Sequence, residues 1–128
     1  MVKRLLITTV IVFAACIGLC TWSLMALNGI LDEAHEYTVE VFAQMEQGNV
    51  TAAREGLIAL ANLWDERMTL MELICAHDDL HEVKERIIEA EICVSYTDME
   101  DFYANVSLIG EALEHIRDGE ALRLTNLY

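Results

Sequence analysis

Proline is absent from the 128-residue chain, and glycine occurs only six times. All-β folds need many tight turns, which depend on such residues. Basic residues are also scarce, because 8 Lys and Arg stand against 22 Asp and Glu, giving a net charge of −14. Binding to nucleic acid requires clustered Lys and Arg. The composition therefore argues against an all-β fold and against a nucleic-acid partner.

The sequence also lacks the common catalytic motifs. It contains no phosphate-binding loop, no Gly-x-Ser-x-Gly and no His-Glu-x-x-His. Its carboxylates are spread along the chain, and no spacing indicates a pair of acids in a cleft. We therefore predict a protein that is not an enzyme and that needs no cofactor.

One long uncharged run is present near the N-terminus. Residues 5–27 follow Lys3 and Arg4, and acidic residues begin at Asp32. As a helix, the run is about 35 Å long, which is enough to cross a hydrocarbon core of roughly 30 Å. Trp22 lies near its far end, where an indole suits the headgroup region. We predict a single-span signal anchor at 5–27, with residues 1–4 in the cytoplasm and an acidic domain at 28–128 outside, by the positive-inside rule.

Two alternatives to an uncleaved anchor remain open. A cleaved signal peptide would have a shorter apolar core and a small-x-small site, for which Gly18 and Cys20 fit better than Leu24 and Ala26. A lipoprotein would be cleaved before Cys16, although Phe13 is a weak first residue for that motif. The length of the run favours the anchor.

Beyond the run, the apolar residues recur with a helical period. Four stripes predict an all-α domain, a small up-down bundle of about four helices with tetratricopeptide-like hairpins. The first stripe ends at a turn around Gly48 and Asn49. In chain order, the residues of the four stripes are Leu31, Ala34, Thr38, Val41 and Met45; Ala53, Leu57, Leu60, Trp64, Met68, Met71 and Cys75; Leu80, Val83, Ile87, Ala90 and Val94; and Met99, Phe102, Val106, Ile109, Leu113 and Ile116.

The breaks between the later stripes follow from their phase. Extending the second stripe past Cys75 would place charged residues in the core, so we expect a break near residues 77–79. Asp79 with Glu82, and Thr97 with Glu100, match the capping-box spacing. Gly119 is expected to close the last helix. Without proline or glycine at these points, each break could be a turn or a kink.

The four cysteines do not predict a disulfide. Cys16 and Cys20 lie in the apolar run, where they act as small packing residues. In an antiparallel hairpin that turns near Asp78, Cys75 and Cys93 would be offset by roughly 18 Å along the axis, too far for a disulfide. We expect two buried thiols.

The layout resembles an uncharacterised family of small helical membrane proteins with a single anchor, from Gram-positive and often spore-forming bacteria. The four cysteines and the Asp78-Asp79 pair depart from that family. The resemblance implies a location in the cell envelope, frequent encoding beside a larger multi-pass membrane protein, and no assigned activity. It rests on Lys3-Arg4 with the apolar run, Leu63-Trp64, His77, Leu113-Glu114-His115-Ile116, Glu120 and Leu124-Thr125-Asn126-Leu127-Tyr128.

We therefore predict a membrane-tethered interaction or accessory protein whose partner is a multi-pass membrane protein. An apolar tail after the expected last cap is the candidate contact, with docking back onto the bundle as the alternative. The tail residues are Leu122, Leu124, Leu127 and Tyr128.

Metal binding is the competing hypothesis. In an up-down bundle, all four histidines should fall at the end nearest the membrane, beside acidic residues. Imidazole and carboxylate ligands suit Zn²⁺. No strict ligand motif is present, so we assign no metal site and name only candidates: His35, His77, His81 and His115.

Overall fold

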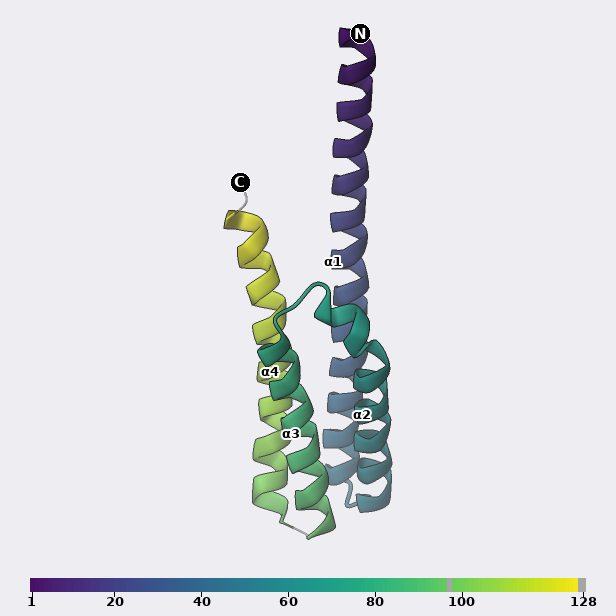
Figure 1. The fold of residues 1–128 in the computed structure, drawn as a ribbon. Coiled ribbons are helices and arrows are strands. Elements are labelled where there is room, and N and C mark those ends of the chain that lie inside the picture. The colour runs from purple at the N-terminus through teal and green to yellow at the C-terminus, as the bar shows by residue number, and fades with distance from the viewer. Residues whose placement is uncertain (97, 127–128) are drawn as a thin grey trace.

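The computed structural model describes residues 1–96 and 98–126, with side chains described as far as Glu120. The described chain forms α1 (Val2–Glu46), α2 (Val50–Glu72), α3 (His77–Ser95) and α4 (Met99–Asn126). The helices run alternately up and down, and each packs against the next, with α4 returning to α1 (Figure 1). No strand occurs in the described ranges. The expected all-α, up-down bundle is confirmed.

Helix α1 is a single helix of 45 residues that joins the apolar run to the first helix of the bundle. Residues 1–22 are all exposed and extend beyond the bundle, whereas buried side chains begin at Leu27 (Figure 1). We call residues 2–22 the projecting half and residues 27–46 the packed half. The end of the bundle from which the projecting half extends is its upper end, as drawn in Figure 1.

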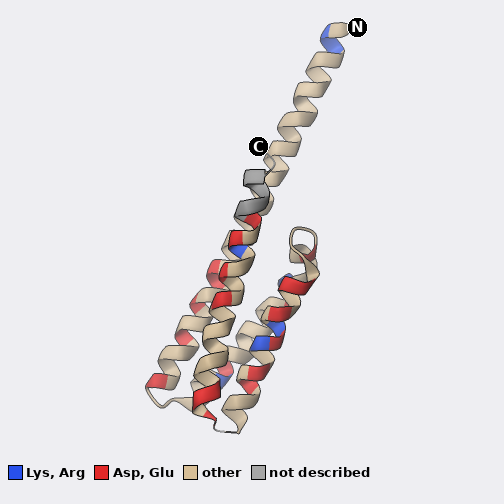
Figure 2. Cartoon of the chain, turned by 90° about the vertical axis from the view of Figure 1, so that its left-hand side faces the viewer, with Lys and Arg blue, Asp and Glu red and all other residues tan. Residues whose placement is uncertain are grey.

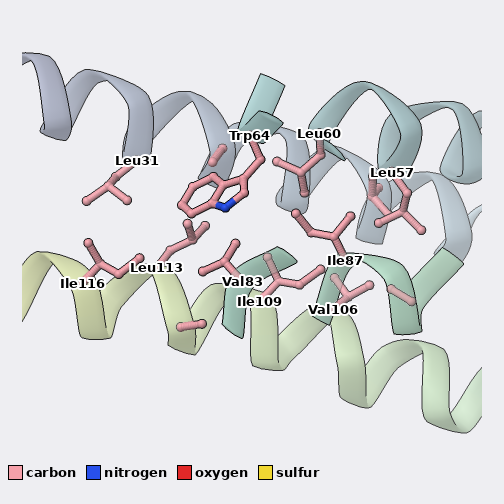
Figure 3. Packing of buried hydrophobic residues seen from close by; sticks show 14 of the residues in the cluster. Leu31, Leu57, Leu60, Trp64, Val83, Ile87, Val106, Ile109, Leu113 and Ile116 are labelled. Atoms are coloured by element: carbon pink, nitrogen blue, oxygen red, sulfur yellow. The ribbon is translucent and has the colours of Figure 1, made fainter. Parts of the chain in front are cut away.

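The core follows the four apolar stripes. Every stripe residue is buried except Met68, which is half-buried, and Met99, which is 36% exposed. Trp64 is the largest buried side chain, and its Nε1–H donates to the Leu80 carbonyl across the α2–α3 interface at 3.0 Å. Its indole lies among residues of the other helices, including Leu31 and Leu113 (Figure 3). Helical periodicity therefore identified most of the core, to which Leu27, Ile30, Leu63 and Ala112 also belong.

The turn between α1 and α2 forms where the sequence predicts it. Gly48 has a φ of 78°, a conformation that glycine adopts without strain. The Asn49 side chain then caps α2 by accepting from the Ala52 N–H at 3.3 Å. This turn lies at the lower end of the bundle.

The break between α2 and α3 is a true turn, but it lies at residues 73–76, four residues before the predicted break at 77–79. The Leu73 and Ile74 N–H groups donate three residues back, which tightens the end of α2 without glycine. The N-cap of α3 is Ala76, with no side-chain cap, so the predicted Asp79–Glu82 capping box is wrong. The stripe phase located the change of direction, but the turn itself contributes Cys75 to the core.

Helix α4 begins at Met99, and the predicted Thr97–Glu100 capping box includes Thr97, which lies outside the described residues. The Asp98 carboxylate accepts from the N–H three residues on, that of Asp101, at 3.3 Å. A hydrogen bond with Asp98, together with the negative charges of Asp98 and Glu100, raises the pKa of Asp101. At the other end, the helix runs through Gly119 to Asn126, so Gly119 does not close it. A helical glycine with open space around it costs too little to end a well-packed helix.

Candidate functional site

The projecting half of α1 is the largest exposed apolar surface in the described chain. Its side chains are mostly bare of contacts, as in Leu5 at 72%, Phe13 at 68% and Trp22 at 56% exposure. Its most apolar 18-residue window has a mean hydropathy of 2.3, and none of that window is buried. By length and composition, this helix can cross a membrane, as expected for residues 5–27.

The charged side chains, in contrast to the exposed apolar ones, lie mainly on the bundle. Acidic residues lie on all four helices of the bundle and are absent from the projecting half, which carries only Lys3 and Arg4 at its tip (Figure 2). Among the described residues, two Lys or Arg side chains form ion pairs between neighbouring helices, Arg117 with Asp32 and Lys84 with Asp65. Most carboxylates remain solvated, so the bundle presents a strongly negative surface.

An apolar groove follows the seam between α1 and α4. The hollow has a volume of about 200 Å³, and Val39 on its α1 side is 54% exposed. Ser107 and Gly110 form the α4 side, where their small side chains leave the seam open. The full lining is Thr38, Val39, Phe42, Val106, Ser107 and Gly110.

The groove continues towards the upper end as an acidic hollow of about 580 Å³. Ser107 and Gly110 line both hollows, so the two form one continuous surface, which we call the α1–α4 groove. Its upper part is lined in addition by His35, Glu111, Glu114, His115 and Asp118. The groove is thus apolar in its lower part and negatively charged in its upper part, which complements an apolar segment with basic flanks.

The apolar periodicity of the sequence does not reveal this groove. Ser107 and Gly110 were not singled out, since they lie beside the predicted apolar stripe and outside it. Their spacing of three residues on one helix, opposite Val39 and Phe42, is the signal that could have pointed to it. That signal becomes readable only once α1 and α4 are known to be neighbours.

The chain was compared with protein families, curated proteins and solved structures. Residues 21–127 match the model of the family described as "Domain of unknown function (DUF4363)". The chain belongs to the DUF4363 family. No curated protein and no solved structure matches it. The expected membership of an uncharacterised family is confirmed, and the DUF4363 match includes the packed half of α1 and the rest of the bundle.

The four histidines of the DUF4363 domain lie near the upper end but divide among separate partners. His77 Nδ1 is 3.3 Å from Glu72 Oε1, and the His77 ring stacks on that of His81 with centroids 6.0 Å apart. His115 Nε2 is 3.7 Å from Asp79 Oδ1, and His35 shares the α1–α4 groove with His115. Among the described residues, no group of three His, Cys, Asp or Glu side chains could hold a metal ion.

The remaining candidates are the tail and the thiols. Leu122 and Leu124 lie in the last turns of α4, but their side chains, like Leu127 and Tyr128 as a whole, are outside the described residues. Cys75 and Cys93 are free thiols, as expected, although only Cys75 is buried. Cys93 is half-buried and accepts from the Asn105 amide at 3.4 Å.

Proposed function

We propose that this DUF4363 protein is a membrane-tethered, non-enzymatic accessory protein of a bacterial cell envelope. Residues 5–27 act as the anchor, and residues 28–128 form the extracytoplasmic domain. The observation that carries the proposal is the projecting half of α1, which beyond Lys3 and Arg4 is uncharged on all sides and is exposed along its whole length in the described structure. A helix of this kind is stable in lipid and would aggregate in water.

The proposed orientation places the N-terminus in the cytoplasm. Lys3 and Arg4 flank one end of the apolar run, and acidic residues from Asp32 onward flank the other. Such an asymmetry favours retention of the basic end on the cytoplasmic side. Protease added outside intact cells with a permeable wall should digest the bundle, whereas full protection of the bundle would contradict this orientation.

The proposed partner is a multi-pass membrane protein that the bundle contacts beside the bilayer. The α1–α4 groove supports this idea, because it offers an apolar floor with an acidic upper rim close to the proposed anchor. A partner loop with apolar side chains and Lys or Arg flanks would complement both parts. The tail residues Leu122, Leu124, Leu127 and Tyr128 are a further proposed contact.

Photo-crosslinking in cells tests the partner. A benzoylphenylalanine at Val39 places the crosslinker in the groove, and one at Ile58 on α2, 43% exposed, is the matched control. We expect a multi-span membrane protein to be captured from position 39 and not from position 58. Gly110→Leu should abolish that capture, because the position has open space and the leucine would fill the groove. Equal capture from both positions, or capture unaffected by Gly110→Leu, would contradict the proposal.

A further inference from the structure

The turn between α2 and α3 exposes a large apolar side chain at the upper end of the bundle. Leu73 is 82% exposed, whereas the leucines of the core are buried. The turn, Leu73-Ile74-Cys75-Ala76, carries no charge. It lies on the same side of the bundle as the projecting half of α1 (Figure 1).

The packing of α2 on α1 sets the height of this turn. Gly56 of α2 lies against Val41 of α1, where an added Cβ would be 2.7 Å from Val41 Cγ2. The two helices are antiparallel, so the 17 residues from Gly56 to Leu73 match the 17 residues from Val41 back to Leu24. At a rise of 1.5 Å per residue, both stretches cover about 26 Å. Leu73 therefore lies at about the level of Leu24, where the uncharged run of α1 is ending.

The turns at the opposite end of the bundle have a different character. The α1–α2 turn is Gln47-Gly48-Asn49, and α4 is capped there by Asp98. These are polar residues typical of turns in water. The upper turn instead carries no polar side chain, and the N–H groups of residues 73, 74 and 75 donate to carbonyls of Leu70 or Met71, as those of residues 47, 48 and 49 donate to α1 carbonyls in the lower turn. Satisfied N–H groups lower the cost of placing a turn beside lipid.

We propose that the α2–α3 turn is a second membrane contact, with the Leu73 side chain seated in the bilayer interface beside the anchor. This inference rests on the proposed function, because the level of the turn matters only if α1 spans the bilayer. The contact would hold the bundle upright on α1 and keep the upper part of the α1–α4 groove at the membrane surface. The lipid is uncharged or zwitterionic, since the bundle is strongly acidic and is repelled by anionic headgroups.

Tryptophan quenching by brominated lipid tests the contact in the full chain. Trp22→Phe removes the emitter of the anchor, and the buried Trp64 remains as a constant background. Into this protein we would place Leu73→Trp, with Tyr96→Trp as the matched control, because Tyr96 is 81% exposed and lies at the lower end. Ile11→Trp in the projecting half reports on the anchor itself. Each protein is reconstituted in dibrominated phosphatidylcholine vesicles and in the same lipid without bromine.

We expect most of the added emission to be lost for Ile11→Trp and for Leu73→Trp, and little to be lost for Tyr96→Trp. If Leu73→Trp behaves like Tyr96→Trp while Ile11→Trp is quenched, the turn is in water, and the inference is wrong although the anchor stands. If Ile11→Trp is not quenched, the anchor fails and the inference fails with it. Quenching of all three would mean that the bundle lies along the bilayer, which also overturns the upright contact. Far-UV circular dichroism checks that each variant keeps its helix content.

Discussion

Helix α1 is continuous from Val2 to Glu46, yet its two halves are built for different surroundings. The projecting half is apolar all round and packs against no other part of the described chain. The packed half is amphipathic, burying one face and exposing acidic residues such as Glu33, Glu36 and Glu40 on the other. The backbone hydrogen bonds of a helix do not depend on what surrounds it, so one helix serves both regions without a break.

The difference shows that the two halves of one continuous helix can contribute differently to the stability of the fold. Burial of the side chains of the packed half stabilises the bundle by roughly 1.5–3 kcal/mol for each large residue. The side chains of the projecting half contribute nothing comparable to bundle stability, because no neighbouring helix covers them. Substitutions in the two halves should therefore act on different measurements.

The largest expected effect is on bundle stability. Leu31 is fully buried, so Leu31→Ala should lower the free energy of unfolding by about 2–5 kcal/mol through lost burial and a residual cavity. Ile11→Ala, in the projecting half, is the control and should leave it unchanged. Urea unfolding in detergent, followed by circular dichroism, measures both. Equal losses would mean that the projecting half also packs on the bundle.

The converse experiment measures membrane retention. Ile11→Arg places a charge inside the apolar run, at an insertion cost that reaches about 2.5–3.5 kcal/mol at the centre of a span. We expect the protein to move from the carbonate-resistant membrane fraction to the soluble fraction. Val39→Arg, an exposed position of the packed half, should remain in the membrane fraction. Retention of Ile11→Arg would show that another part of the chain suffices for attachment.

Two glycine substitutions test how closely neighbouring helices cover the packed half of α1 at two of its positions. At Gly56 an added methyl meets the stiff, buried Val41 side chain, so Gly56→Ala should destabilise the bundle by about 1–3 kcal/mol. Gly29 has no neighbour within 4 Å, and Gly29→Ala should stabilise it by up to about 1 kcal/mol through helix propensity. Thermal unfolding compares the signs. In addition, Val41→Ala should reduce the penalty of Gly56→Ala, and failure to do so would contradict the α1–α2 register.

The smallest effect concerns pH and the bundle alone, because the projecting half has no carboxylate that can titrate. The pKa of Asp101 is raised in the folded bundle, so the folded state holds that proton more tightly than the unfolded state. Its contribution to stability is present at pH values below the ordinary aspartate pKa and is lost as the pH rises through the raised pKa. Asp101→Asn should remove this contribution, so that the melting temperature changes less with pH over that interval. An unchanged pH profile would contradict the interaction with Asp98.

The sequence was a good guide to the helices and a poorer guide to their ends. Apolar periodicity identified the faces of all four helices, because one face of each must be buried. It misplaced the α2–α3 turn, since Ile74 and Cys75 are apolar residues that pack from within a turn. It also closed α4 at Gly119, although a single glycine inside a helix costs only about 1 kcal/mol and the helix continues to Asn126. The His81–Glu85 pair is local, since its members are four residues apart on α3, whereas the contacts of His77 with Glu72 and of His115 with Asp79 depended on how the helices meet.

By itself the sequence determined the all-α class, the long apolar stretch and the acidic character of the bundle. Each of these is local, because it depends on composition or on a period of a few residues along one helix. Only the tertiary structure decided that Ser107 and Gly110 open a groove against Val39 and Phe42, and that Leu73 lies level with Leu24. These features depend on which helices are neighbours and on the register between them. That register is set by packing contacts such as Gly56 on Val41, which join residues far apart in the chain.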